Sequence, residues 1–266
     1  AMGDLDEALK LMTPALDAKT PHNLTVNAAN AIKARLALYF GKNDVAAASA
    51  LKVINSGKYT IATTATFAST FNTDSTPNQI FSIANSSTDN QSTNGIANIY
   101  RGSYGDIVFL NDLYSKYEAG DIRRSLFTTL NAGVNYRNTG KYPTANSVDD
   151  IPVIRYEEMI LTYAEAMLKS GNASEALKYL NMIPAARGAA PYAAATLDNI
   201  LLERRKEFAG EGFRFFDLAR NGKDLPLVNS TLQTYGTIKY GDYNYFYFLD
   251  LLGSFSMHSI VKLLGN

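Results

Sequence analysis

Few side chains in this sequence have the types and spacing that catalysis needs. The chain of 266 residues has two histidines, His22 and His258, and it has no cysteine. Cysteine nucleophiles, disulfides and zinc thiolate sites are therefore excluded. Neither histidine lies near a patterned acid or nucleophile, and there is no Gly-x-Ser-x-Gly elbow or phosphate-binding Gly-rich loop. The sequence does not predict a hydrolase triad or a nucleotide site.

Two pairs of carboxylates have the residue types that glycosidases use. Glu157 adjoins Glu158, and Glu203 precedes Glu207 by four residues, both within predicted helices and beside arginines. Because helical Glu next to Arg more often forms ion pairs than acid–base machinery, we expect structural ion pairs and no enzyme activity. Calcium held by loop oxygens at 146–150 is compatible with the sequence but not indicated, and we expect no cofactor.

The composition is that of a neutral globular protein. Lys+Arg and Asp+Glu balance at 25 each, which excludes an electrostatic footprint for nucleic acid. No apolar run is long enough to span a membrane, and residues 1–3 do not begin a signal peptide. There are 17 Tyr and 13 Phe but no Trp, so stacking on a sugar ring would come mainly from Tyr.

Apolar residues at helical spacing predict helices in two separated parts of the chain. The predicted helices cover residues 4–18, 25–40, 44–54, 153–169 and 174–183, with a last helix-rich stretch at 196–220. A shift of 129 residues superimposes Asn43 on Asn172 and Ala47 on Ala176. This pattern is typical of tetratricopeptide-like helix pairs, and the alternative is an ordinary helical hairpin that occurs twice.

The part between these helices, residues 60–150, is rich in Ser, Thr, Asn and Gly. We expect long loops there, with a short strand at 80–83 and a short helix near 109–117. Loops on a rigid helical scaffold are where binding residues tend to lie, so this part is the predicted ligand-binding part.

The most informative segment mixes dense charge with four phenylalanines. It covers residues 203–220 and has the sequence ERRKEFAGEGFRFFDLAR. Because a core does not tolerate unpaired arginine, we expect a half-buried network in which Arg pairs with Glu and Asp against aromatic faces. Gly210 and Gly212 allow one helix to end and the next to begin.

This segment resembles the C-terminal signature of the SusD/RagB family. The helix that precedes it, residues 152–166 with the sequence PVIRYEEMILTYAEA, and the shorter runs DIRR at 121–124 and VINSGKY at 53–59 also resemble that family. The residues that carry the structural signature are Arg155, Tyr156, Glu165, Glu203, Arg204, Arg205, Glu207, Glu211, Gly212, Arg214, Asp217 and Arg220.

The resemblance implies a mostly α fold, in which tetratricopeptide-like helix pairs form an α-α superhelix with long irregular loops and a few short strands. It implies one SusD-like domain over 1–266, with a helical repeat part at 4–58, a ligand-binding part at 59–150, a helical signature part at 151–223 and an atypical tail at 224–266. Family members are longer and begin with a lipidated Cys, so we expect a C-terminal part or a short member.

The implied function is that of a cell-surface lipoprotein of the outer membrane in a SusC/SusD-type nutrient uptake system. Such a protein passes oligosaccharide to a TonB-dependent, SusC-like transporter, its partner. The alternatives are a peptide-binding, RagB-like uptake protein and a tetratricopeptide-like interaction scaffold without a small ligand. The signature is scaffold and does not identify the ligand site.

The candidate ligand-binding residues are therefore chosen on physical grounds. Sugar rings stack on aromatic side chains, and their hydroxyls bond to Asn, Asp and Arg. A loop at 98–106 and a second patch at 136–142 have that mixture. The predicted site residues are Asn98, Tyr100, Arg101, Tyr104, Asp106, Tyr136 and Tyr142.

Overall fold

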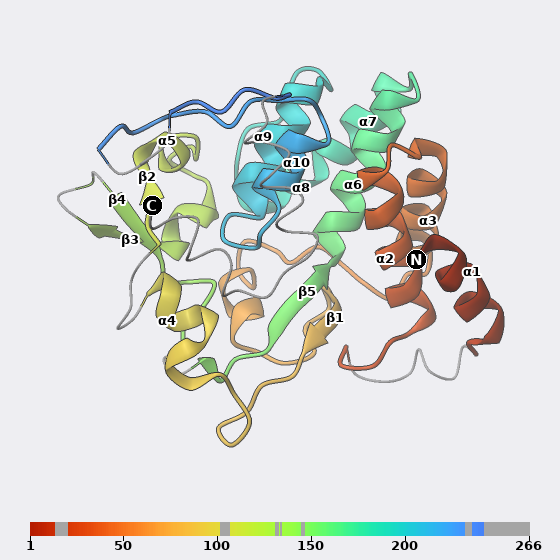
Figure 1. Cartoon of the computed structure of the whole chain (residues 1–266), viewed down its shortest axis with the longest axis horizontal. Helices are drawn as coiled ribbons and strands as arrows, with labels where there is room; N and C mark the ends of the chain where they lie inside the picture. The colour runs from red at the N-terminus through yellow and green to blue at the C-terminus, as the bar shows by residue number, and fades with distance from the viewer. Residues whose placement is uncertain are drawn as a thin grey trace. The chain divides into compact units, whose positions relative to one another are not determined.

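The described part of the chain is mostly helical with a few short strands, as the sequence predicts (Figure 1). The computed structural model describes residues 1–13, 21–101, 107–130, 133, 135–144, 147–231 and 236–241. The chain divides into two compact units, Ala1–Phe213 and Arg214–Asn266.

The α-helices of the first unit are α1 (Met2–Leu11), α2 (Val26–Tyr39), α3 (Asn43–Asn55), α4 (Ile96–Tyr100), α5 (Asn111–Tyr114), α6 (Tyr156–Lys169), α7 (Ala173–Leu180), α8 (Met182–Arg187) and α9 (Leu197–Glu207). Its strands and short 3-10 helices are η2 (Ala68–Phe71), β1 (Gln79–Ile83), η3 (Ser92–Asn94), β2 (Phe109–Leu110), η4 (Ile122–Leu126), β3 (Phe127–Leu130), β4 (Asn135–Asn138) and β5 (Ile151–Arg155).

Two helix pairs in the first unit, α2 with α3 and α6 with α7, turn in the same way. Gly41 joins the first pair with a φ of +69°, and Gly171 joins the second with a φ of +85°. Glycine adopts this left-handed conformation without strain, and it lets the turn close with a backbone hydrogen bond. The N–H to carbonyl bonds are Lys42 to Ala37 (2.8 Å) and Asn172 to Met167 (2.9 Å).

The match between the two pairs corresponds to a shift of 130 residues, and the predicted shift of 129 is wrong by one. With Gly41 placed on Gly171, the buried positions after the turn coincide, in α3 on one side and in α7 and the start of α8 on the other. These are Ala46 with Ala176, Ala50 with Leu180, and Val53 with Ile183. The sequence comparison matched identical residue types, whereas the turn glycine and the buried face determine the structural register.

Small side chains bring the first helix pair and α6 into one core. α2 and α3 bury alanines completely, which lets their backbones approach closely. Facing them, α6 buries Met159, Ile160 and Leu161 with no exposed area. Burying one such side chain contributes about 1.5–3 kcal/mol, so this interface holds the neighbouring helices together (Figure 1).

The segment 153–155 is a strand, not the start of a helix as predicted. β5 runs antiparallel to β1, with Ile154 opposite Phe81. Arg155 has extended backbone angles, with φ −111° and ψ 155°, and α6 begins at the next residue, Tyr156. A short run of β-branched residues fits both a strand and the end of a helical pattern, and pairing with β1 decides between them. The predicted strand at 80–83 is confirmed as β1.

A second sheet has the strand order β2-β4-β3, and all its pairs are antiparallel. Phe109 lies opposite Tyr136 in this sheet. The helix predicted near 109–117 is therefore limited to α5, because Phe109 and Leu110 pair with β4 instead of starting a helix.

The predicted loop at 98–106 is wrong for its first residues, because α4 ends only at Tyr100. The start of α4 is tied to the segment before β5. The Ala97 N–H donates to the Ser147 hydroxyl at 3.3 Å, and a Cβ at Gly95 would collide with that same side chain. A close tertiary contact thus fixes this short helix.

The second unit begins with α10 (Arg214–Ala219). Within it, Arg220 pairs with Asp217 at 2.7 Å, and Leu225 forms an antiparallel bridge with Ile238. The predicted atypical tail extends from here into residues 242–266, which lie outside the described residues. Among the helices that the structure describes, none is both long and apolar enough to cross a lipid bilayer.

Gly188 provides a test of the packing between α8 and the middle of the chain. It ends α8 with a φ of +69°, and a Cβ there would lie 2.8 Å from the Gly120 carbonyl oxygen. We expect Gly188→Ala to lower the free energy of unfolding by about 2–4 kcal/mol, because backbone strain and overpacking each cost about 1–3 kcal/mol. Urea unfolding measures this change.

Gly171→Ala is the matched control. Gly171 also has a positive φ, +85°, but a Cβ there would have no neighbour within 4 Å. Only the backbone strain of about 1–2 kcal/mol should remain. Equal losses in the two variants would contradict the proposed contact with Gly120.

Candidate functional site

A network of buried ion pairs joins the signature helix α9 to the middle of the chain. Glu207, the last residue of α9, has a side chain with no exposed area. Its carboxylate accepts hydrogen bonds from Arg123, Arg155 and Arg187, at 3.1, 3.1 and 2.9 Å. Burial by itself would raise the pKa of Glu207, but these three arginines together hold its pKa well below the usual range.

The same arginines, together with Lys206, bind the other carboxylates of the network. The pairs are Arg123 with Asp121 (2.7 Å) and Glu203 (2.6 Å), Arg187 with Glu157 (2.9 Å), Arg155 with Glu157 (3.1 Å) and Lys206 with Glu203 (3.4 Å). Glu158 pairs separately with Arg35 at 2.5 Å. The prediction that both carboxylate pairs form structural ion pairs is confirmed.

The remaining signature residues also make packing or ionic contacts. Their contacts are Arg204 over Phe208 (5.3 Å), Arg205 with Asp112 (2.5 Å), Tyr156 stacked on Tyr59 (6.2 Å) and Glu165 with Lys169 (2.9 Å). Within the second unit, Arg214 begins α10 and Asp217 pairs with Arg220 (2.7 Å). Arg187, which lies outside the signature, is 3.9 Å from the centre of the Phe67 ring and is an example of the expected aromatic support.

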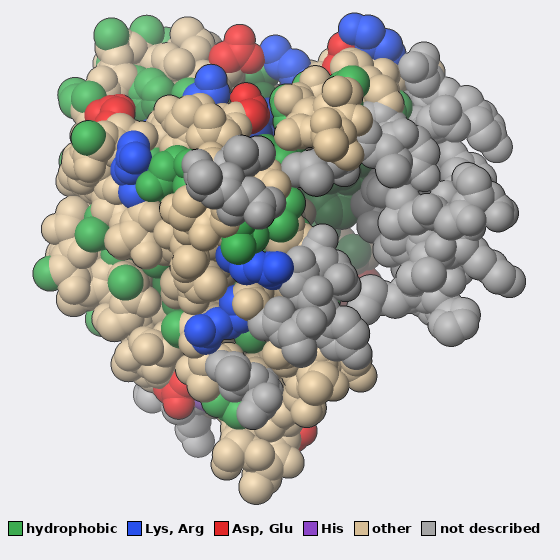
Figure 2. Space-filling view, turned by 90° about the vertical axis from the view of Figure 1, so that its left-hand side faces the viewer, with side chains coloured by type: hydrophobic (Ala, Val, Ile, Leu, Met, Phe, Trp, Pro, Cys, Tyr) green, Lys and Arg blue, Asp and Glu red, His purple; other side chains and the backbone are tan. Residues whose placement is uncertain are grey.

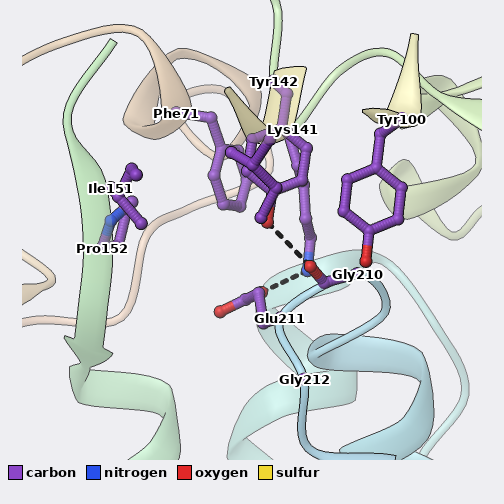
Figure 3. A pocket seen from close by; sticks show the side chains of 10 residues that line it. Phe71, Tyr100, Lys141, Tyr142, Ile151, Pro152, Gly210, Glu211 and Gly212 are labelled. Carbon is purple, nitrogen blue, oxygen red and sulfur yellow. Dashed lines mark hydrogen bonds and ion pairs between the residues drawn. The ribbon is translucent and has the colours of Figure 1, made fainter. Parts of the chain in front are cut away.

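One end of this network lines a pocket of about 250 Å³ (Figure 3). Its wall is formed by a part of β5, by Tyr100 at the end of α4 and by the turn that follows α9. The lining residues are Phe71, Ile96, Tyr100, Lys141, Tyr142, Ile151, Pro152, Gly210, Glu211 and Gly212. A concave, mostly apolar site with few polar groups is the usual form of a ligand pocket, so this is the candidate site.

The segment after β4 is fastened to the turn after α9, and this positions Tyr142. The Tyr142 hydroxyl donates to the Gly210 carbonyl at 2.7 Å, and the Asn138 amide donates to the Ala209 carbonyl at 3.2 Å. The Lys141 ammonium donates to the Glu207 carbonyl at 2.6 Å. These bonds hold the Tyr142 side chain in place.

Gly210 suits this turn because of its backbone conformation. Its φ is +84°, which glycine adopts without strain, whereas a Cβ there would make only ordinary van der Waals contacts with the rings of Phe109 (3.4 Å) and Tyr142 (3.7 Å).

Three aromatic rings form a stack beside the pocket. The rings of Tyr100 and Tyr142 are nearly parallel, with centroids 5.1 Å apart and an angle of 6°. Tyr100 also stacks on Phe109, at 5.6 Å. Tyr100, which the sequence predicts as a ligand-binding residue, is therefore packed between two neighbouring aromatic rings. Figure 3 shows Tyr100 and Tyr142 above Glu211, with Ile151 and Pro152 across the pocket.

The polar groups of the pocket are held in defined protonation states. Burial, with the nearby Glu211 charge, raises the pKa of Tyr100, and it raises the pKa of Tyr142 more strongly. Both phenols are therefore neutral at physiological pH. Burial lowers the pKa of Lys141, against the opposing effect of Glu211. Burial by itself would raise the pKa of Glu211. The positive charges of Arg155 and Lys141 lower it by more, so the pKa lies below its ordinary value and the carboxylate is ionised.

Two of the predicted ligand-binding residues, Tyr100 and Tyr142, line the pocket although 42 positions separate them in sequence. Arg101 follows α4 and is half-buried, outside the pocket lining. Tyr104 and Asp106 lie outside the described residues.

Two other predicted residues are buried and do not line the pocket. Asn98 lies within α4, and its amide donates to the Ser92 carbonyl at 2.7 Å. Tyr136 lies in β4, where its ring stacks on Tyr114 with centroids 3.8 Å apart. Their side chains pack within the fold, because β4 is the central strand of its sheet and α4 rests on the segment before β5.

Several lining residues are not among those predicted from the sequence. Phe71, Lys141 and Ile151 had no pattern that set them apart from ordinary core residues. Glu211 and Gly212 belong to the signature, which the resemblance assigns to the scaffold, yet they also line the pocket. The dense charge of the signature is the sequence feature that could have pointed to Glu211 as a lining residue.

The region considered for calcium is occupied by internal hydrogen bonds where it is described. The Asp149 carboxylate accepts from the Thr144 hydroxyl at 2.8 Å, and the Asp150 carboxylate accepts from the Asn85 N–H at 3.0 Å and contacts His22 at 2.5 Å. Within the described ranges no group of three or more His, Cys, Asp or Glu side chains has the arrangement of a metal site.

The face shown in Figure 2 mixes hydrophobic side chains with Lys and Arg near its middle. Acidic side chains lie mainly toward its upper and lower edges in that view.

The comparisons with known proteins agree on one family. The model of the SusD family matches residues 81–251, which is more than half of the chain. SusD-like protein P38 of Formosa agariphila is 36% identical over a stretch that makes up 33% of this chain and 21% of that protein.

Solved structures match the fold. A SusD superfamily protein from Bacteroides thetaiotaomicron has a TM-score of 0.77 at 24% identity, over 91% of this chain and 60% of its own. A SusD-like carbohydrate binding protein from Bacteroides vulgatus has a TM-score of 0.75 at 24% identity, over 85% of this chain and 51% of its own. The chain thus spans half to three fifths of the length of these structures.

Proposed function

Because this chain belongs to the SusD family, we propose that it is the glycan-binding component of a nutrient uptake system on the outer membrane of the cell. In this proposal it binds oligosaccharide at the cell surface and passes it to a TonB-dependent, SusC-like transporter. The protein binds its ligand without converting it. The observation that carries the proposal is the family match over residues 81–251.

The pocket beside Tyr142 supports the glycan part of this proposal. It offers aromatic and proline rings together with hydroxyl and charged groups, the combination that binds the apolar face and the hydroxyls of a sugar. The relatives support the same ligand class, since one similar solved structure is described as a carbohydrate binding protein. The helix pairs α2–α3 and α6–α7 provide the scaffold on which the transporter would dock.

Binding of a glycan panel by calorimetry tests the proposal. We expect saturable heat with at least one soluble polysaccharide, and at least tenfold weaker binding in Tyr142→Ala, because the residue forms the aromatic side of the pocket. Tyr114→Ala is the matched control, since Tyr114 stacks on Tyr136 and does not line the pocket.

Two outcomes would contradict the proposal. Binding of short peptides but of no glycan would favour a peptide-uptake protein. Binding only to a co-expressed SusC-like transporter, with no small ligand, would favour an interaction scaffold.

A further inference from the structure

The charges that line the pocket are already neutralised by one another. In the described part of the chain, Lys141 and Glu211 are the charged lining residues, and they form an ion pair (Figure 3). The Lys141 ammonium also donates to the Glu207 carbonyl at 2.6 Å. The pocket therefore presents a cation and an anion that satisfy each other.

Glu211 is bound from a second side as well. One carboxylate oxygen accepts from the Arg155 Nη2 at 2.8 Å, and the other accepts from the Arg155 Nε at 3.0 Å. Both oxygens of Glu211 are thus engaged before any ligand arrives. The Lys and Arg side chains seen near the middle of the face in Figure 2 lie at the surface, whereas Lys141 is buried.

An anionic ligand would lose its hydration in this pocket without gaining an unpaired cation. Transfer of a carboxylate or sulfate from water into a buried site is unfavourable unless an opposite charge pairs with it. A neutral ring loses less, because its hydroxyls exchange hydrogen bonds with water for bonds with neutral groups such as the Tyr100 phenol. The charge arrangement thus discriminates between two classes of sugar.

The size and shape of the pocket limit the ligand to one ring. Its volume of about 250 Å³ lies below the range of about 300–1,000 Å³ that takes drug-sized ligands. Ile151 and Pro152 offer an apolar surface on one side, and the Tyr142 ring lies across from them. These surfaces suit the C–H face of a sugar ring.

We propose that this pocket receives one uncharged sugar ring of a glycan, and that the Lys141–Glu211 pair sets a preference for neutral over anionic units. This inference rests on the proposed glycan-binding function and adds the ligand class. Lys141 and Glu211 are specificity-determining residues in this account, because their mutual pairing removes the net charge that would attract a uronate or a sulfate.

The test compares neutral and acidic glycans that differ only in the C6 carboxylate. The pairs are mannohexaose with hexameric mannuronate, cellohexaose with hexameric cellouronate, and methyl-esterified with de-esterified oligogalacturonate. Calorimetry on the full chain should show at least tenfold tighter binding of the neutral member in any pair that binds. An acidic member that binds as tightly as its neutral partner, or more tightly, would overturn the inference.

Glu211→Gln is the specificity variant. It removes the carboxylate partner of Lys141, while Arg155 keeps its pairs with Glu207 and Glu157, so the ratio of neutral to acidic affinity should fall about tenfold because an anion can then pair with the Lys141 ammonium. Glu175→Gln is the matched control, because Glu175 pairs with Lys178 on α7, outside the pocket, and should leave the ratio unchanged. An unchanged ratio in Glu211→Gln would contradict the role assigned to the pair.

Lys141→Met keeps the inference testable if Glu211→Gln does not fold. It removes the cation while Arg155 still binds Glu211, so the preference for neutral glycans should persist or increase. A shift toward acidic glycans in Lys141→Met would overturn the inference.

The failure of this inference differs from the failure of the proposed function. Glycan binding that is unaffected by Tyr142→Ala would place the ligand outside the pocket and would overturn the inference alone. No binding of any glycan to the unaltered chain would overturn both.

Discussion

We expect Glu207→Gln to lower the free energy of unfolding by about 3–5 kcal/mol, because removing one partner from a buried ion pair leaves uncompensated charge in the interior. Glu207 is fully buried and accepts hydrogen bonds from Arg123, Arg155 and Arg187. The neutral amide keeps the shape of the side chain, so the loss reports charge and not packing. For a chain of this size the melting temperature should fall on the order of 10 °C.

Calorimetric melting and urea unfolding measure this loss, and Glu175→Gln serves as the control. Glu175 pairs with Lys178 at 3.7 Å near the surface, where Lys178 is exposed and Glu175 is partly exposed, and such surface pairs contribute about 0–1 kcal/mol. A loss of less than about 1 kcal/mol in Glu207→Gln would show that the network does not stabilise the folded chain in the way that its burial implies.

The second large effect is a loss of stability in acid. The pKa values of Glu207 and Glu211 are lowered in the folded chain, from an ordinary value of 4.5, because arginines and Lys141 outweigh the effect of burial. Below about pH 4.5 the unfolded chain therefore binds protons that the folded chain does not. Stability is fully present above this pH and falls as the pH falls through the lowered pKa values.

Urea unfolding at a series of pH values from 7 to 3 measures this loss, and Glu207→Gln separates the contribution of Glu207. Because the variant cannot take up that proton, its stability should depend less on pH in the acid range. The difference between the unaltered chain and the variant should shrink as the pH falls. A difference that stays constant down to pH 3 would exclude Glu207 as a source of the acid loss.

Much of the helical scaffold follows from local sequence pattern. The helix pairs around Gly41 and Gly171 were predicted from apolar spacing and turn residues, which act over a few positions. The repeat shift was wrong by one residue, and 153–155 proved to be a strand. The first error arises because the turn glycine and the buried face, not identical residue types, determine the register of the repeat. The second arises because pairing with the distant strand β1 overrides the local helical pattern.

The candidate site was predicted only in part. Tyr100 and Tyr142 are predicted because a sugar ring can stack on an aromatic side chain, and both line the pocket. Nothing in the sequence distinguished them from Tyr136, which is buried in the central strand of its sheet. Exposure of a tyrosine depends on which neighbours cover it, and those neighbours come from other elements.

The family resemblance, the helical repeat and the charged aromatic network can be read from the sequence, because each depends on residue types at short, regular spacing. Which residues meet at the pocket depends on the folded chain. Lys141 and Glu211 are 70 positions apart, and their pairing depends on the bonds that fasten the segment after β4 to the turn after α9. That pairing sets the charge of the pocket, and long-range contacts of this kind leave no local signal in a single sequence.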